Sequence, residues 1–207
     1  FAVIAVILNH FNKDFLPSGF LGVDIFFVIS GFVITSSLSS KKNGDFFDFI
    51  TNFYARRIVR IIPLLLIITF FSTLLTCLFH PQARAPLNTG IASLFGFSNI
   101  YLVRIATDYF AQSTELNPFT HTWSLGVEEQ FYFVFPILVW FSGFSKQTRK
   151  SFKNLFITIL FLATLSLLGF IYFYPINQSA TYFLMPFRFW EIGLGSLTFI
   201  FLNKKQT

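Results

Sequence analysis

Cysteine, charge and the common catalytic signatures are scarce in this sequence. The single cysteine, Cys77, cannot form a disulfide within the chain. Charged residues make up only 12% of the chain, about half of the share usual in soluble domains. There is no glycine-rich phosphate loop and no cysteine and histidine spacing typical of a metal site, and the three histidines lie far apart. These features argue against a disulfide-stabilised domain, a soluble nucleotide-binding enzyme and a metal centre.

Apolar residues are instead abundant. They make up 54% of the 207 residues, and phenylalanine alone contributes 33. A soluble core of this size could not bury so many rings, whereas lipid can surround them. The composition therefore indicates an integral membrane protein.

Six segments approach the ~20 apolar residues that a helix needs to cross a bilayer. They are 1–11, 20–38, 61–79, 123–141, 155–174 and 182–202. The third begins with Pro63 in its first turn, where proline is tolerated. A weaker segment, 90–103, is interpreted as re-entrant or interfacial. The sequence predicts an all-α fold, a polytopic transmembrane helix bundle with about six spans.

Basic residues predict the orientation of this bundle. Segments 39–60 and 142–153 and the tail hold 11 of the 15 basic residues: Lys41, Lys42, Arg56, Arg57, Arg60, Lys146, Arg149, Lys150, Lys153, Lys204 and Lys205. Six alternating spans place all of these on one side, which the positive-inside rule makes cytoplasmic. Because they form no continuous basic face, no nucleic-acid partner is expected.

Neither end of the sequence is typical of a complete membrane protein. Phe1 opens inside an apolar run without a methionine or a basic leader region, and Thr207 follows directly on an apolar segment. We therefore interpret residues 1–207 as a partial integral-membrane domain.

The most informative stretch is 121–140, which begins as a polar motif and continues as a membrane helix. Glu128 and Glu129 lie at the start of its apolar run. An ionisable residue at membrane depth costs a few kcal/mol and usually has a function. This combination suggests chemistry within a membrane protein.

Four stretches, in order, carry a family resemblance. They are 2–10, which ends in His10; 19–35, which contains Asp24; 53–63, which contains Arg57 and Arg60; and 121–136. Together they closely resemble the acyltransferase-3 family of membrane O-acyltransferases, which includes bacterial O-antigen and peptidoglycan O-acetylases. Segment 185–195 matches a further helix of that family, so the resemblance covers nearly the whole chain.

The resemblance implies transfer of an acyl group, usually acetyl from acetyl-CoA, to a sugar hydroxyl at the bacterial inner membrane. His10 matches the family's essential histidine, and a family arginine would fall upstream of Phe1. Arg57 and Arg60 match its Arg-x-x-Arg motif, and Glu128 matches the more constant of its two adjacent glutamates. The implied partners are an acyl-CoA donor, a carbohydrate or glycolipid acceptor and the lipid bilayer, with no bound cofactor.

The chemistry of these residues agrees with that expectation. A histidine can take a hydroxyl proton near neutral pH or carry the acyl group itself; the alternative for His10 is an interfacial residue at a helix end. Arg57 and Arg60 share one helix face and suit the phosphates of CoA. Their alternative is simple anchoring at the membrane surface, which is expected of Arg56 and the lysines.

Supporting roles follow from spacing. Ser124 and Tyr132 lie four residues either side of Glu128, so the three are expected on one helix face. Glu128 is expected to pair with His10, to bind the acceptor or to hold the helix, and we predict that His10 and Glu128 lie close together. Asp24 is a candidate to orient His10, with Asp14 as a rival.

Three further residues are candidates with structural alternatives. Arg188 and Glu191 are three apart and are expected to neutralise each other. Trp123 belongs to the motif, whereas Trp140 is expected at the membrane interface.

Two other functions compete with the enzyme hypothesis. Polar residues within helices also mark the path of a transporter or flippase, and a catalytically inactive protein would share the fold. The acceptor remains open among O-antigen, peptidoglycan, exopolysaccharide and a small glycoside, and the acyl chain could be longer than acetyl.

Overall fold

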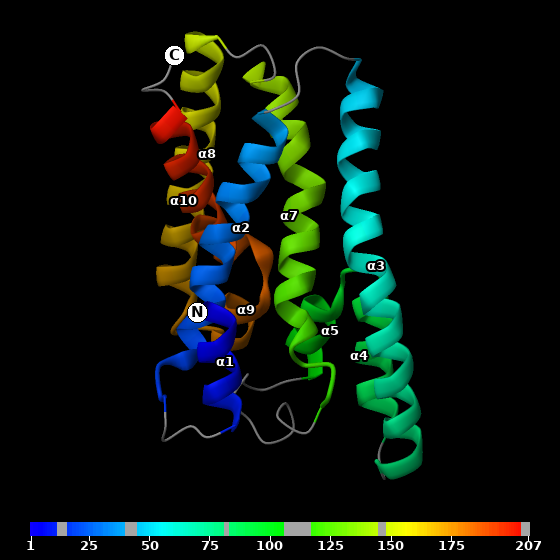
Figure 1. Cartoon of the computed structure of the whole chain (residues 1–207). Helices are drawn as coiled ribbons and strands as arrows, with labels where there is room; N and C mark the ends of the chain where they lie inside the picture. The colour runs from blue at the N-terminus through cyan, green and yellow to red at the C-terminus, as the bar shows by residue number, and fades with distance from the viewer. Residues whose placement is uncertain (12–15, 40–44, 81–82, 106–116, 145–147, 204–207) are drawn as a thin grey trace. The chain divides into compact units, whose positions relative to one another are not determined.

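The computed structural model describes residues 1–11, 16–39, 45–80, 83–105, 117–144 and 148–203, and the regular elements among them are all helical (Figure 1). In chain order they are α1 (Ala2–Phe11), the 3₁₀ turn η1 (Gly19–Leu21), α2 (Gly22–Ser39), α3 (Phe46–Phe79), α4 (Arg84–Leu94), α5 (Ser98–Ile105), α7 (Thr122–Phe141), α8 (Arg149–Phe173), α9 (Gln178–Phe183) and α10 (Met185–Asn203). The all-α prediction is confirmed. Asp14, Lys41, Lys42, Lys146, Lys204 and Lys205 lie outside the described residues.

Three of the described helices are long and apolar enough to cross a membrane. They cover Gly19–Ser39, Phe46–Phe79 and Arg149–Phe173. The helices α7 and α10, with 20 and 19 residues, are not among these three, and each carries two charged residues in its first half: Glu128 and Glu129 in α7, and Arg188 and Glu191 in α10. Each of the six predicted segments is largely helical, which agrees with a membrane bundle, and the number of crossings stays a prediction.

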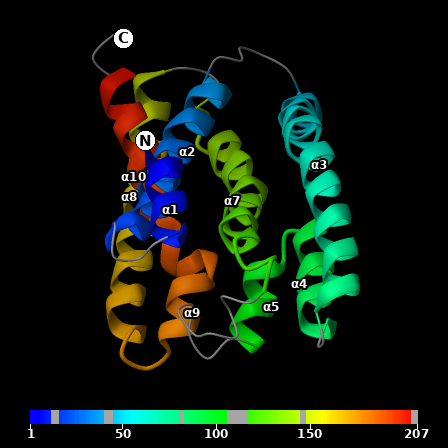
Figure 2. The same ribbon diagram turned by 60° about the horizontal axis from the view of Figure 1, so that its bottom comes forward.

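The chain divides into two compact units. Unit 1 comprises Phe1–Asn43, Leu138–Leu167 and Phe189–Thr207. Unit 2 comprises Gly44–Ile137 and Leu168–Arg188. Within unit 1, α1 packs on η1 and on α2; within unit 2, α4 lies beside the C-terminal half of α3 and contacts α5, which contacts α9 (Figures 1 and 2).

Unit 1 depends on a close approach of α2 and α10. A Cβ at Gly31 would collide with the carbonyl of Ile192, and a Cβ at Gly195 would collide with the carbonyl of Val28. The neighbouring Ser196 hydroxyl donates to the Gly31 carbonyl at 3.3 Å. Small residues at a helix crossing let the backbones approach closely, as is common in membrane bundles.

The helix α3 is much longer than predicted. It begins at Phe46 instead of residue 61, and Pro63 lies in its interior. No glycine occurs in it, Asp48 suits the positive end of the helix dipole, and Phe49 and Phe53 are buried on one side. The prediction that Pro63 opens a helix was therefore wrong: the preceding basic segment is helical and carries its arginines in regular register.

The last predicted span is also divided. The helix α9 ends at Phe183 and α10 begins at Met185, with Leu184 in an extended conformation. Pro186 has no N–H to donate to the Tyr182 carbonyl four residues earlier, and in a continuous helix its ring would clash with that carbonyl, which accounts for the break. A single helix over 182–202 was therefore a wrong prediction.

The weak segment 90–103 is not one continuous helix. Its residues belong to α4 and α5, which are separated by a turn at 95–97 where Gly96 has a φ of 72°. Both helices, at 11 and 8 residues, are too short to cross a bilayer. This agrees with the interpretation that the segment does not form a full span.

Candidate active site

The first half of α7 carries two neighbouring rows of side chains at four-residue spacing. Trp123, Val127, Phe131 and Phe135 form an apolar row, and each is at most 1% exposed. The adjacent row is Ser124, Glu128, Tyr132 and Pro136. Because four residues nearly complete a helical turn, each row follows one side of α7. The apolar row anchors the helix, and the second row presents its polar groups together.

A hydrogen bond joins the two central members of the polar row. The Tyr132 hydroxyl donates to Glu128 Oε2 at 2.7 Å, and the two residues are 7% and 5% exposed. This confirms that they share a face. Hydrogen bonds to a carboxylate are short and strong, so Tyr132 holds the Glu128 side chain in one orientation. Ser124 lies one turn earlier, and its hydroxyl donates to the His121 carbonyl at 3.2 Å.

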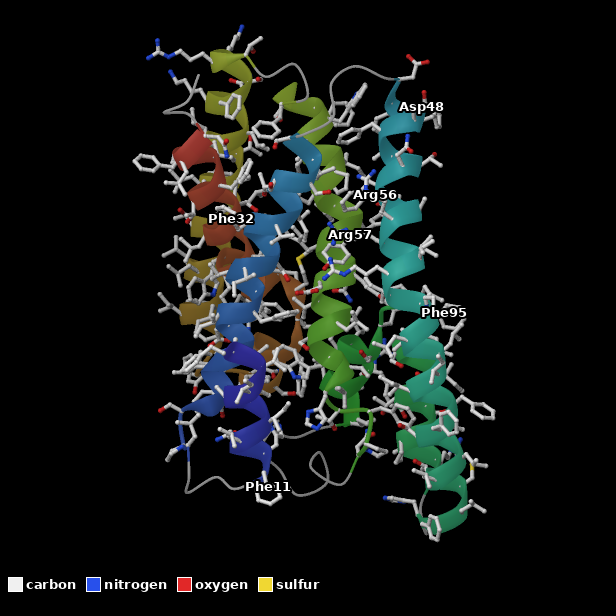
Figure 3. The ribbon with its side chains drawn as sticks, in the orientation of Figure 1. Phe11, Phe32, Asp48, Arg56, Arg57 and Phe95 are labelled. Atoms are coloured by element: carbon white, nitrogen blue, oxygen red, sulfur yellow. The ribbon has the colours of Figure 1, made fainter. Side chains whose placement is uncertain are left out.

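Arg57 of α3 completes the cluster. Its guanidinium lies 5.4 Å from the centre of the Phe53 ring and 5.3 Å from the centre of the Tyr132 ring. Figure 3 shows Arg57 reaching from α3 toward α7. The charge of Glu128 also acts on Arg57. A guanidinium over aromatic faces is stabilised by roughly 0.5–2 kcal/mol, more when it is withdrawn from water.

Arg60 and Arg56 are more exposed than the half-buried Arg57. Arg60 follows Arg57 by three residues, and its charge also acts on Tyr132. The two arginines therefore share the electrostatic environment of the α7 row, which agrees with the prediction that they lie on one helix face. Their binding role stays a prediction.

Arg188 lies among aromatic rings at the start of α10. Its guanidinium is 4.8 Å from the Tyr182 ring centre and 5.8 Å from those of Trp123 and Phe170. Its Nε donates to the Tyr182 carbonyl at 3.0 Å. That carbonyl lies at the end of α9, where the last carbonyls of a helix have no donor within it. These contacts pack Arg188 against Trp123 and the end of α9, and the supporting role of the two residues stays a prediction. Glu191 is 1% exposed and belongs to unit 1, and its neutralisation by Arg188 stays a prediction.

His10 and Asp24 belong to unit 1. His10 is exposed, and its Nδ1 lies 2.8 Å from the Val6 carbonyl. The neighbouring Asn9 is buried and donates to the carbonyls of Leu16 and Pro17, which fixes the end of α1 against the start of the next element. Asp24 lies in the first turn of α2, and its predicted role in orienting His10 stays a prediction.

A second polar cluster was not anticipated from the sequence. Gln130 Nε2 donates to Asn99 Oδ1 at 2.8 Å and to the Gly96 carbonyl at 3.0 Å. Asn99 Nδ2 in turn donates to Gln130 Oε1 and to the Phe183 carbonyl. A Cβ at Gly96 would collide with the Glu129 carboxylate. These contacts tie α5 and the end of α9 to α7 and hold the motif helix in place. Gln130 belonged to the recognised motif, but nothing in the sequence indicated Asn99 as its partner.

Among the residues that the structure describes, no three His, Cys, Asp or Glu side chains come together as metal ligands would. The polar groups of the cluster in unit 2 include the Glu128 carboxylate, the Tyr132 phenol and the guanidinium groups of Arg57 and Arg60, and the His10 imidazole belongs to unit 1.

Comparison with known proteins gives one family. The acyltransferase-3 model, described as an acyltransferase domain, matches residues 1–204. The chain is 37% identical over 198 residues to the O-acetyltransferase OatA of Staphylococcus aureus (strain NCTC 8325 / PS 47), covering 95% of this chain and 32% of that protein. It is 32% identical over 195 residues to a putative O-acetyltransferase of S. aureus (strain COL), covering 94% of this chain and 32% of that protein. The chain thus spans about a third of the length of these relatives. No solved structure matches.

Proposed function

The chain belongs to the acyltransferase-3 family, and we propose that it forms part of an integral membrane O-acetyltransferase. The proposed reaction moves an acetyl group from acetyl-CoA to a hydroxyl of a cell-envelope carbohydrate. The observation that supports it best is the contact of Arg57 with the Tyr132 ring, since Tyr132 also holds Glu128. Two motifs that lie about 70 residues apart in the sequence thereby form one cluster.

Arg57 and Arg60 are proposed to bind the phosphates of the donor. A guanidinium presents a planar fork of N–H groups that matches phosphate oxygens. Arg57 is held from behind by Phe53 and Tyr132, whereas Arg60 is exposed. This arrangement suits an anion that arrives from outside the protein and meets one guanidinium packed against rings and one exposed guanidinium.

His10 is proposed to take the proton of the acceptor hydroxyl. The Val6 carbonyl can only accept a hydrogen bond, so its contact with Nδ1 leaves the lone pair of the neutral ring on Nε2. The proton would pass to Nε2 while the acceptor oxygen forms a bond to the acetyl carbon and the bond from that carbon to sulfur breaks. The imidazolium would then return the proton to the departing CoA thiolate. Acyl transfer through the imidazole itself is the alternative within the same function.

Glu128 is proposed to bind and polarise the acceptor. Glu128 Oε2 accepts the Tyr132 hydroxyl, and an ionised carboxylate can accept about four hydrogen bonds in all, so the same group can also accept from a sugar hydroxyl. A carboxylate with a fixed orientation can select the position of that hydroxyl before reaction.

The proposed location is the bacterial inner membrane, with the donor on the cytoplasmic side. The clustering of basic residues in segments 39–60 and 142–153 supports this orientation through the positive-inside rule. Reporter fusions at loop 142–153 test it: a cytoplasmic signal is expected, and a signal from outside the membrane would contradict the orientation.

The activity itself is tested with the full-length protein in detergent. Radiolabelled acetyl-CoA is supplied with cell-envelope glycans or small glycosides, and labelled ester is measured. Ester formation is expected. Release of neither CoA nor ester, together with movement of a glycan across liposome membranes, would contradict the proposal and favour the transporter.

A further inference from the structure

Pro136 removes one hydrogen bond from the interior of α7. Proline has no N–H, so the carbonyl four residues earlier, that of Tyr132, receives no donor from its own helix. A carbonyl without a partner is costly where water is scarce, and membrane helices satisfy such groups with donors from neighbouring elements. A side chain that donates to the Tyr132 carbonyl therefore removes this cost.

That donor is Tyr54 of α3. Its hydroxyl lies 3.3 Å from the Tyr132 carbonyl and 3.2 Å from the Phe133 carbonyl. Both distances are long for a hydroxyl donor, as expected of one hydrogen shared between two acceptors. The Tyr54 side chain is half-buried.

The same contact lies beside the candidate site. Tyr54 precedes Arg57 by three residues on α3, so the two share a helix face. Tyr132 provides the freed carbonyl, the ring beneath Arg57 and the hydroxyl bonded to Glu128. The adjacent Phe53 ring also meets the Tyr132 ring edge-on, with centroids 6.3 Å apart. The Tyr54 hydroxyl thus fixes α3 against α7 at the turn where Arg57 and Glu128 come together.

We propose that Tyr54 is a positioning residue, which caps the carbonyl freed by Pro136 and thereby holds Arg57 beside the Glu128–Tyr132 pair. Its effect on the donor rests on the proposed function, whereas the cap itself does not. If Tyr54 were only a membrane-interface residue, the effect of removing its hydroxyl would be the same with and without Pro136. The dependence of that effect on Pro136 therefore separates the two explanations.

A double-mutant cycle in the full-length protein tests this proposal. Tyr54→Phe removes only the hydroxyl, and Pro136→Ala restores the N–H that Tyr132 lacks. Pro136→Leu restores the same N–H and replaces the alanine variant if that variant does not fold. The thermal midpoint in detergent and the KM and kcat for acetyl-CoA are measured for each protein. Tyr172→Phe is the matched control, since Tyr172 is exposed and lies outside the cluster.

Tyr54→Phe is expected to lower the thermal midpoint and to raise the KM for acetyl-CoA about three- to tenfold, the range of one lost hydrogen bond, with a smaller change in kcat. In the Pro136→Ala or Pro136→Leu protein both effects should largely disappear, because the N–H of residue 136 then donates to the Tyr132 carbonyl within the helix. Tyr172→Phe should change neither quantity.

Two results would overturn the proposal. Equal effects of Tyr54→Phe with and without Pro136 would show that the hydroxyl does not serve the freed carbonyl. If the effect of Tyr54→Phe on the thermal midpoint depended on Pro136 but the KM for acetyl-CoA did not change, Tyr54 would cap the carbonyl without positioning Arg57. If the parent protein does not use acetyl-CoA, the proposed function fails by that result alone, and the midpoints still decide whether the cap exists.

Discussion

Tyr132 makes contacts of several chemical kinds. Its hydroxyl donates to Glu128, its ring faces the Arg57 guanidinium and its backbone carbonyl accepts from Tyr54. A residue with several simultaneous partners couples them, so changes at one should be felt at the others. At the scale of single residues, this coupling is the main testable property of the site.

The arginine pair provides the first prediction. Arg57→Ala combined with Arg60→Ala should raise the KM for acetyl-CoA much more than it lowers the thermal midpoint, since hydrogen bonds to a charged partner contribute ~1.5–3 kcal/mol each. Arg57→Lys should recover only part of the loss because an ammonium keeps the charge and loses the planar fork. Steady-state kinetics at varied donor concentration measure both. An unchanged donor KM in the double variant would leave these arginines only an anchoring role.

The Tyr132 hydroxyl provides the second prediction. Tyr132→Phe should lower acetyl transfer by roughly tenfold, because Glu128 loses a charge-assisted hydrogen bond inside a buried cluster. Adding Tyr132→Phe to Glu128→Gln should cost little more than Glu128→Gln alone, since the two act as one unit. Rate measurements on the two single variants and the double variant give the comparison. Fully additive losses would contradict the idea that Tyr132 acts through Glu128.

Among the helices, proline and glycine decide how the elements meet. Pro136 leaves α7 helical but frees a carbonyl for α3, whereas Pro186 separates α9 from α10. Gly31 and Gly195 let α2 and α10 approach until backbone meets backbone. These four residues define junctions between elements and contribute no chemistry of their own.

The glycine pair gives a prediction at this scale. Gly31→Ala or Gly195→Ala should each destabilise the protein by roughly 1–3 kcal/mol, because an added methyl would press on a carbonyl of the facing helix and force the helices apart. Gly169→Ala is a suitable control: it lies in α8, and an added Cβ there would meet only the Phe187 ring at ordinary contact distance. Thermal midpoints in detergent measure all three variants. A loss at Gly169 equal to that at Gly195 would contradict this explanation.

Sequence patterns predicted where most helices lie but not how they end. Each of the six apolar segments is largely helical in the structure, because a helix that crosses lipid needs a long apolar stretch. The start of α3 was missed because its first turns are polar and basic, and only the packing of Phe49 and Phe53 shows why they continue as helix. The α9 and α10 break depends on one proline inside an apolar run.

The candidate site was predictable only in part, for a similar reason. Four-residue spacing placed Glu128 and Tyr132 on one face, because partners within a helix follow from its geometry alone. Partners between helices depend on rotation and depth, which no single segment encodes. Tyr54 and Asn99 were therefore missed, although Pro136 already indicated that a donor to Tyr132 was required.

At the scale of the whole molecule, the family's motifs are divided between the two units. His10, Asp24 and Glu191 belong to unit 1, and Arg57 and Glu128 belong to unit 2. The central claim is that His10 and Glu128 serve one reaction, and this stays a prediction. Costly polar groups on separate membrane helices are best tolerated when they face one shared, hydrated cavity.

The most direct test of this claim is the rate of acetyl transfer by the full-length protein, compared between His10→Ala, Glu128→Gln and the double variant. Groups that act in one step lose most of the activity with the first substitution and little more with the second. We predict that His10→Ala and the double variant lose activity to a similar extent, with thermal midpoints close to that of the parent protein. Full transfer activity in His10→Ala would contradict the account and would favour the transporter instead.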